Sequence, residues 1–85
     1  MTHYWHVTMT DIFGGQANYC WVREYVFADT GQNDRAIVRE AKALTGLTGW
    51  PAVTYNHGDS FEIRPRGLCQ VVFVEHREGA LEESP

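Results

Sequence analysis

The sequence predicts an α+β fold in two layers, an antiparallel sheet of four to five strands with one helix packed on one face, in the order ββαβββ. Three observations predict this class. Apolar and polar residues alternate with period two in several segments, one stretch alone has helical periodicity, and short reversal signals separate neighbouring extended segments. Short connections favour antiparallel neighbours, and a helix between them supplies the second layer.

The chain length and composition predict one domain. With 85 residues there is room for a single hydrophobic core, and a hydrophobic content of 44 % is too rich for a disordered chain. We expect this domain to span residues 1–76. Residues 77–85 are acidic and end in proline, which is typical of a flexible tail.

The first two strands are predicted to form a hairpin. Residues 3–9 alternate as a strand, residues 11–16 hold the Gly14-Gly15 pair expected to reverse the chain, and residues 18–27 form the second strand. One face of that second strand is aromatic with an arginine at its middle, and the other is small and suits a packed helix. The aromatic face carries Tyr19, Trp21, Arg23, Tyr25 and Phe27, and the small face carries Cys20, Val22, Glu24 and Val26.

Residues 34–45 are predicted to be the helix. Asn33 or Asp34 can cap its first turn, and Gly46 is placed to end it in the left-handed conformation. Its apolar face carries Ile37, Ala41 and Leu44, with Val38 at the edge. On the opposite side Arg35, Arg39 and Lys42 are spaced i, i+4 and i+7. Such a ridge is typical of a solvated helix face, with binding of acidic residues or RNA as the functional alternative.

Three further strands are predicted after the helix. Residues 50–56 form the first, which Pro51 places at a strand start or on an edge. Residues 61–64 follow, then a type I turn at residues 64–67. Residues 68–76 are the most apolar strand and are therefore expected at the centre of the sheet.

Charge and cysteine content restrict location and partners. The formal net charge is −4, which disfavours general nucleic-acid binding and favours a partner with a basic surface. No secretion signal or membrane-spanning segment is recognisable, so we expect a cytoplasmic protein in which Cys20 and Cys69 are reduced. Each cysteine lies in an apolar strand and is predicted to be a small buried thiol. Whether the two thiols touch stays open.

Motifs for catalysis, metals or cofactors are not recognisable in the sequence. His3 and His6 lie three apart on a strand and face opposite sides, so they do not share a metal ion. The glycine pairs do not have phosphate-binding spacing. We therefore expect no enzymatic activity, no metal and no cofactor.

The candidate site is the sheet face that the helix leaves open. Exposed aromatic residues with arginine are typical of protein interfaces, and a two-layer domain has nothing else to cover that side. Cross-strand aromatic pairing that only stabilises the sheet is the alternative. The predicted partner-binding residues are Tyr4, Tyr19, Trp21, Arg23 and Tyr25 as anchors, with Glu62 and Arg64 on the later hairpin, and His6 lies on the same predicted face.

Three segments, FGGQANYCWVREY, NDRAIVREAKALTGLTG and HGDSFEIRPRGLCQVVFVEH, resemble short proteins carried by bacteriophages, prophages and plasmids of proteobacteria. The resemblance implies an accessory role in a mobile element, and small acidic α+β proteins of such elements include anti-CRISPR proteins. Those act stoichiometrically by covering a functional surface of a host effector. The local charge outside the tail is not strongly acidic, which argues against simple DNA mimicry.

The sequence therefore predicts an anti-CRISPR-like inhibitor that acts in the host cytoplasm by binding a CRISPR effector or another defence protein. The alternatives are a homodimeric module whose aromatic face packs on itself, and an accessory protein that stacks single-stranded nucleic acid on that face. The sequence leaves open the host system, the targeted subunit, the strand order and the oligomeric state.

Overall fold

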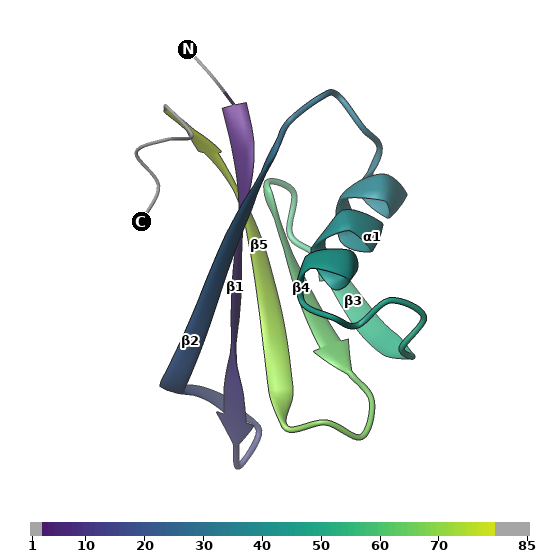
Figure 1. The fold of residues 1–85 in the computed structure, drawn as a ribbon. Helices are drawn as coiled ribbons and strands as arrows, with labels where there is room; N and C mark the ends of the chain where they lie inside the picture. The colour runs from purple at the N-terminus through teal and green to yellow at the C-terminus, as the bar shows by residue number, and fades with distance from the viewer. Residues whose placement is uncertain (1–2, 80–85) are drawn as a thin grey trace.

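The computed structural model describes residues 3–79, which form five strands and one helix. The elements are β1 (His3–Phe13), β2 (Gln16–Ala28), α1 (Asp34–Leu44), β3 (Ala52–Asn56), β4 (Ser60–Pro65) and β5 (Gln70–Glu78). Neighbouring strands all pair antiparallel in one open sheet of order β2-β1-β5-β4-β3 (Figure 1). The predicted α+β class and the order ββαβββ are confirmed, and the apolar strand β5 is central.

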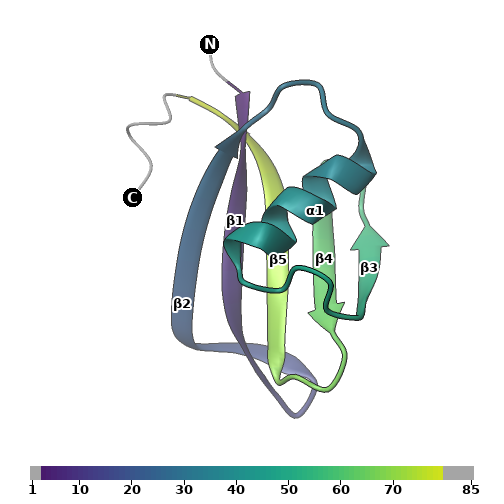
Figure 2. The same ribbon diagram turned by 45° about the vertical axis from the view of Figure 1, so that its right-hand side comes forward.

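The core lies between α1 and the sheet face that it covers (Figure 2). Register aligns the apolar side chains of neighbouring strands, since Val7 is opposite Val74 and Ile63 is opposite Val72. The buried members of this cluster are Trp5, Val7, Met9, Phe27, Ile37, Ala41, Leu47, Phe61, Ile63, Val72 and Val74. The helix therefore buries the predicted Ile37 and Ala41.

Both ends of α1 are fixed by local chemistry. The Asn33 side chain accepts a hydrogen bond of 2.9 Å from the backbone N–H of Ala36, as a helix N-cap does. At the other end Gly46 has φ 77°, and the N–H of Leu47 donates to the carbonyl of Lys42 at 2.7 Å. Leu47 is buried by this reversal, whereas Leu44, on the predicted apolar face of the helix, is exposed.

Several predicted boundaries differ from the structure. β1 continues to Phe13, which shortens the predicted loop 11–16 to the Gly14-Gly15 turn. β5 continues to Glu78 because that residue pairs with His3, so Arg77 and Glu78 belong to the sheet and not to the tail. The rest of the predicted tail, residues 80–85, lies outside the described residues.

The missing backbone N–H of proline explains the positions of the two prolines at strand ends. Pro51 lies just before β3, an edge strand, as predicted. Pro65 is the last residue of β4, and the turn expected at residues 64–67 instead begins at Arg66. Pro65 pairs with Ala52 of β3, but pairing between β4 and β5 ends at Ile63, so no residue of β5 requires the N–H that Pro65 lacks.

The connection between β2 and α1 is tied to the centre of the sheet through Asp29. Its carboxylate accepts hydrogen bonds from the N–H of Gly31 at 3.0 Å and pairs with His76 Nε2 at 2.9 Å. The Gly31 bond and then the His76 contact lower the pKa of Asp29 below its usual 3.8. The His76 ring stacks on His3 and meets the edge of Trp5, so one carboxylate joins three elements.

A pH titration of the Asp29→Asn variant tests this tie. Folding lowers the pKa of Asp29, so the stability that its charge contributes is fully present above about pH 3.8 and is lost as the pH falls through the folded-state pKa. The difference in unfolding free energy between wild type and Asp29→Asn is therefore expected to be largest near neutral pH and to shrink below pH 3.8. Urea denaturation from pH 7 down to acid measures it. The variant Asp59→Asn, at an exposed turn, is the control, and an equal pH profile in both variants contradicts the assignment.

Candidate protein-binding face

The sheet face opposite α1 carries one row of side chains that crosses all five strands. Cross-strand partners define this row, because residues directly opposite each other share a face. In sheet order it consists of Glu24, Thr8, Phe73, Glu62 and Tyr55. We call the face that holds this row the open face. Tyr4, His6, Arg64 and Glu75 share it by the same alternation.

The predicted aromatic site is divided between two faces. Register pairs Met9 with Arg23 and Val7 with Tyr25, so these β2 side chains lie on the helix side of the sheet. Tyr25 packs against the core, and Phe27 is buried in it. The expectation that Arg23 and Tyr25 share an open face with Tyr4 is therefore wrong. The sequence period shows which side chains of one strand share a face, whereas the register between strands decides which faces join.

Arg23 lies on the helix side of β2 but outside the buried core, and its contact with the Trp21 ring places Trp21 beside it. The Arg23 guanidinium carbon is 5.6 Å from the centroid of the Trp21 ring, which places the two side chains together as a cation–π pair. Trp21 is 37 % exposed. These predicted anchors are accessible to solvent, but they lie on the sheet face that α1 packs against.

A bulge separates Tyr19 from the rest of the aromatic series. Pairing of β1 with β2 shifts between Thr10 and Ile12, and four β2 residues, 18–21, lie between the partners of those two positions. Within it Tyr19 has φ 56°, the one positive φ among the described residues that are not glycine. As a result its ring lies on the open face, stacked against Phe73 with the centroids 6.5 Å apart. A bulge that redirects one side chain is a recurrent feature of sheet edges and binding sites.

The bulge is held by Asp11, which also changes the environment of Cys20. The Asp11 carboxylate accepts a 2.9 Å hydrogen bond from the N–H of Cys20. Partial desolvation raises the pKa of Asp11, but this bond and its other hydrogen bonds outweigh desolvation and lower the pKa overall. The negative charge of Asp11 in turn raises the pKa of the Cys20 thiol, which disfavours the reactive thiolate.

The two cysteines are exposed, whereas the sequence predicted buried thiols. Cys20 and Cys69 are both free and exposed. Cys20 lies in the bulge, where strand alternation fails, and Cys69 lies in the bend before β5, so neither thiol occupies the apolar strand environment that the sequence predicted.

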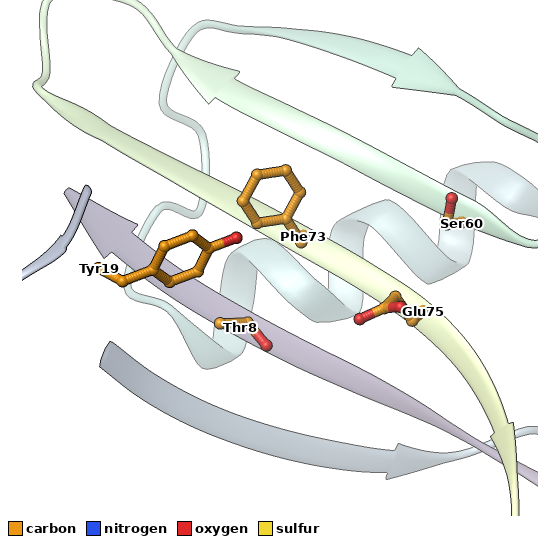
Figure 3. A pocket seen from close by; sticks show the side chains of 5 residues that line it. All are labelled: Thr8, Tyr19, Ser60, Phe73 and Glu75. Atoms are coloured by element: carbon orange, nitrogen blue, oxygen red, sulfur yellow. The ribbon is translucent and has the colours of Figure 1, made fainter. Parts of the chain in front are cut away.

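Tyr19 and Phe73 form one wall of a pocket of about 380 Å³ on the open face (Figure 3). The remaining lining residues are Thr8, Ser60 and Glu75, so with Tyr19 and Phe73 two aromatic rings, three hydroxyls and one carboxylate converge there. In the free protein Glu75 is paired with Arg77 at 3.4 Å. Aromatic faces beside a carboxylate attract a cation, and the hydroxyl oxygens can accept its N–H donors. The pocket is therefore suited to the guanidinium or ammonium end of a basic side chain.

A buried histidine supports the floor of this pocket. His6 is only 3 % exposed, and its Nε2 atom lies 3.0 Å from a carboxylate oxygen of Glu24. Its Nδ1 atom lies 3.4 Å from the hydroxyl oxygen of Thr8. The contacts of His6 with Glu24 and Thr8 thus give each ring nitrogen of His6 a polar partner and position the Thr8 hydroxyl at the pocket.

Sequence reasoning placed part of this face correctly and missed its centre. Glu62 and Arg64 lie on the open face as predicted, joined by a close ion pair, and His57 is 4.0 Å from Glu62. The residues that were missed are Thr8, Ser60, Phe73 and Glu75. For Phe73 and Glu75 the sequence signal is the alternation of β5, in which these two residues are out of phase with the buried Val72 and Val74. The high apolar content of this strand does not by itself separate its two faces.

Comparison of the chain with family models, curated proteins and solved structures gives no match. Within residues 3–79 no helix is both long and apolar enough to cross a membrane. Over the same residues no three His, Cys, Asp or Glu side chains gather as a metal site would require.

Proposed function

We propose that this protein is a small inhibitor that binds a partner protein stoichiometrically through the open face. The observation that carries the proposal is the pocket in which the Tyr19 and Phe73 rings stand beside the Glu75 carboxylate. A lysine or arginine of the partner would enter it and replace Arg77 as the ion-pair partner of Glu75. The resemblance to mobile-element proteins points to a host defence effector, with a CRISPR effector subunit as the first target.

The chemistry of the open face supports a basic protein partner. Tyr19 and Tyr55 are 55 % and 47 % exposed, and aromatic side chains at the centre of an interface carry much of its binding energy. Three glutamates, Glu24, Glu62 and Glu75, lie on the same face. Two of them pair with arginines of the same face, Glu62 with Arg64 and Glu75 with Arg77, so these groups keep a surplus of one negative charge, which disfavours stacking of single-stranded nucleic acid there.

Phage plaque formation on a host with active CRISPR immunity tests the proposal. Expression of the wild-type protein is expected to restore plaques, and the tagged protein is expected to capture the effector from lysate at one copy per binding site. Glu75→Lys puts a positive charge where a basic side chain should bind, and is expected to weaken the complex by at least about 100-fold. Glu40→Lys makes the same charge change on exposed α1 and is the control. Equal capture of the effector by wild type and Glu75→Lys rejects the open face as its binding site.

A second candidate is a homodimer joined through the outer edge of β2. That strand has 13 residues, and within residues 3–79 its one sheet neighbour is β1. Val22 on its open-face side is 45 % exposed, so apolar surface accompanies the unpaired backbone edge. Light scattering separates the candidates, because a mass that stays monomeric at every concentration removes the homodimer.

A further inference from the structure

A second hollow, of about 290 Å³, lies between α1 and the loop that follows the helix. Three basic side chains of the helix, Arg35, Arg39 and Lys42, line it at the spacing i, i+4 and i+7. Val38 forms an apolar part of the lining, and Thr48 and Gly49 complete it from the loop after the helix. Three of the seven lysines and arginines of a chain with formal charge −4 are thus gathered at one place.

The loop after α1 forms the second wall of this hollow. After Leu47 enters the core, the N–H of Trp50 donates to the carbonyl of Leu47 at 2.9 Å, which closes a turn with Gly49 at its third position. Gly49 has φ 75°, as the third residue of a type II turn requires. Lys42 Nζ donates to the carbonyl of Trp50 at 2.6 Å and holds this loop against the helix.

The positive charges in the hollow are not neutralised by the protein over residues 3–79. None of the ion pairs in this range involves Arg35, Arg39 or Lys42. The nearby carboxylate of Asp34 instead accepts a hydrogen bond of 2.9 Å from Asn56 of β3. Like charges three and four residues apart on a helix repel each other, so a bound anion would relieve this repulsion.

We propose that this hollow binds a phosphate group. A phosphate monoester carries a charge of about −1.5 to −2 at neutral pH and three acceptor oxygens, which matches two guanidinium groups and one ammonium. A carboxylate carries one charge and would leave two of the three positive charges uncompensated, whereas a phosphate monoester leaves about one. The volume is at the lower end of small-molecule sites, which range over about 300–1,000 Å³, and so suits a phosphate head with a small organic part against Val38.

Titration with inorganic pyrophosphate, followed by two-dimensional NMR of the full chain, tests the site. Backbone resonances of Arg39, Lys42 and Gly49 are expected to shift together and to saturate. Arg39→Gln removes one bidentate donor from an exposed helix position and is expected to weaken binding by about tenfold. Arg23→Gln removes the same charge from β2 and is expected to leave binding unchanged.

The outcomes separate the sources of phosphate. Saturable binding of pyrophosphate and adenosine diphosphate through Arg39 supports a soluble phosphorylated ligand. Stronger binding of a ten-residue oligothymidylate that is also weakened by Arg39→Gln overturns the monoester assignment, because a phosphodiester carries only one charge and two free oxygens. Shifts with hexaglutamate but not with pyrophosphate overturn the proposal in favour of an acidic peptide. Equal weakening by Arg39→Gln and Arg23→Gln also overturns it, because it shows attraction by net charge alone.

Discussion

Replacement of Phe61 by alanine is expected to lower the free energy of unfolding by about 3–5 kcal/mol. Phe61 is 2 % exposed and lies opposite Val74, and its ring centroid is 5.8 Å from that of Trp5. The substitution removes the largest fully buried side chain and leaves a cavity between the sheet and α1. A chain of 85 residues has a total stability of only about 4–13 kcal/mol, so the loss brings the domain close to unfolding.

Urea or guanidinium denaturation of the Phe61→Ala variant measures this loss. The matched control is Phe13→Ala at the end of β1, where the same ring is 80 % exposed, and its effect is expected to stay within about 0.5 kcal/mol. In thermal unfolding the Phe61→Ala variant is expected to melt at least about 12 °C below wild type. A loss similar to that of the Phe13→Ala control contradicts the core assignment of Phe61.

Replacement of Tyr19 by glycine is expected to weaken partner binding by at least about 2 kcal/mol, or roughly 30-fold, while leaving stability nearly unchanged. Glycine keeps the backbone at φ 56° without the steric cost of about 1–2 kcal/mol that other residues pay in the left-handed region. That gain offsets the lost stacking on Phe73, which is about 0.5–1.5 kcal/mol. The variant therefore removes the pocket wall from a protein that still folds.

Binding to the captured effector, measured by calorimetry beside a thermal melt, separates the two effects. Trp21→Ala is the control, because it also removes an exposed aromatic ring from β2 but on the helix side of the sheet. Tyr19→Phe keeps the ring and is expected to bind like wild type. If Trp21→Ala abolishes binding and Tyr19→Gly does not, the partner contacts the helix side of β2 and the open face is rejected as the binding site.

The two proposed sites lie on different layers of the molecule. The pocket with Tyr19, Phe73 and Glu75 belongs to the open face, and the hollow with Arg35 and Arg39 lies between α1 and the loop that follows the helix. One recognises positive charge and the other negative charge. A variant in one site is therefore expected to leave the ligand of the other site bound, which makes the two proposals independent in experiment.

Local patterns predicted the helix and the identity of each strand. The Asn33 cap, the Ile37 and Ala41 face, and the Gly46 stop are all decided within about one helical turn, and each is present in the structure. Pro51 marked an edge strand for a similarly local reason, since it lacks an N–H. The strand ends were harder to predict, because residues such as Glu78 join a strand only when a distant partner, here His3, lies beside them.

By itself the sequence determined the α+β class, the order ββαβββ and the division of each strand into two faces, because these follow from side-chain periodicity and short-range capping. Only the tertiary structure decided which faces join across the sheet. The pairing of Val7 with Tyr25 turned most of the β2 aromatic series toward the helix, and the bulge opposite Asp11 turned Tyr19 the other way. Register and bulges arise from contacts between strands, so no period within a single strand contains them.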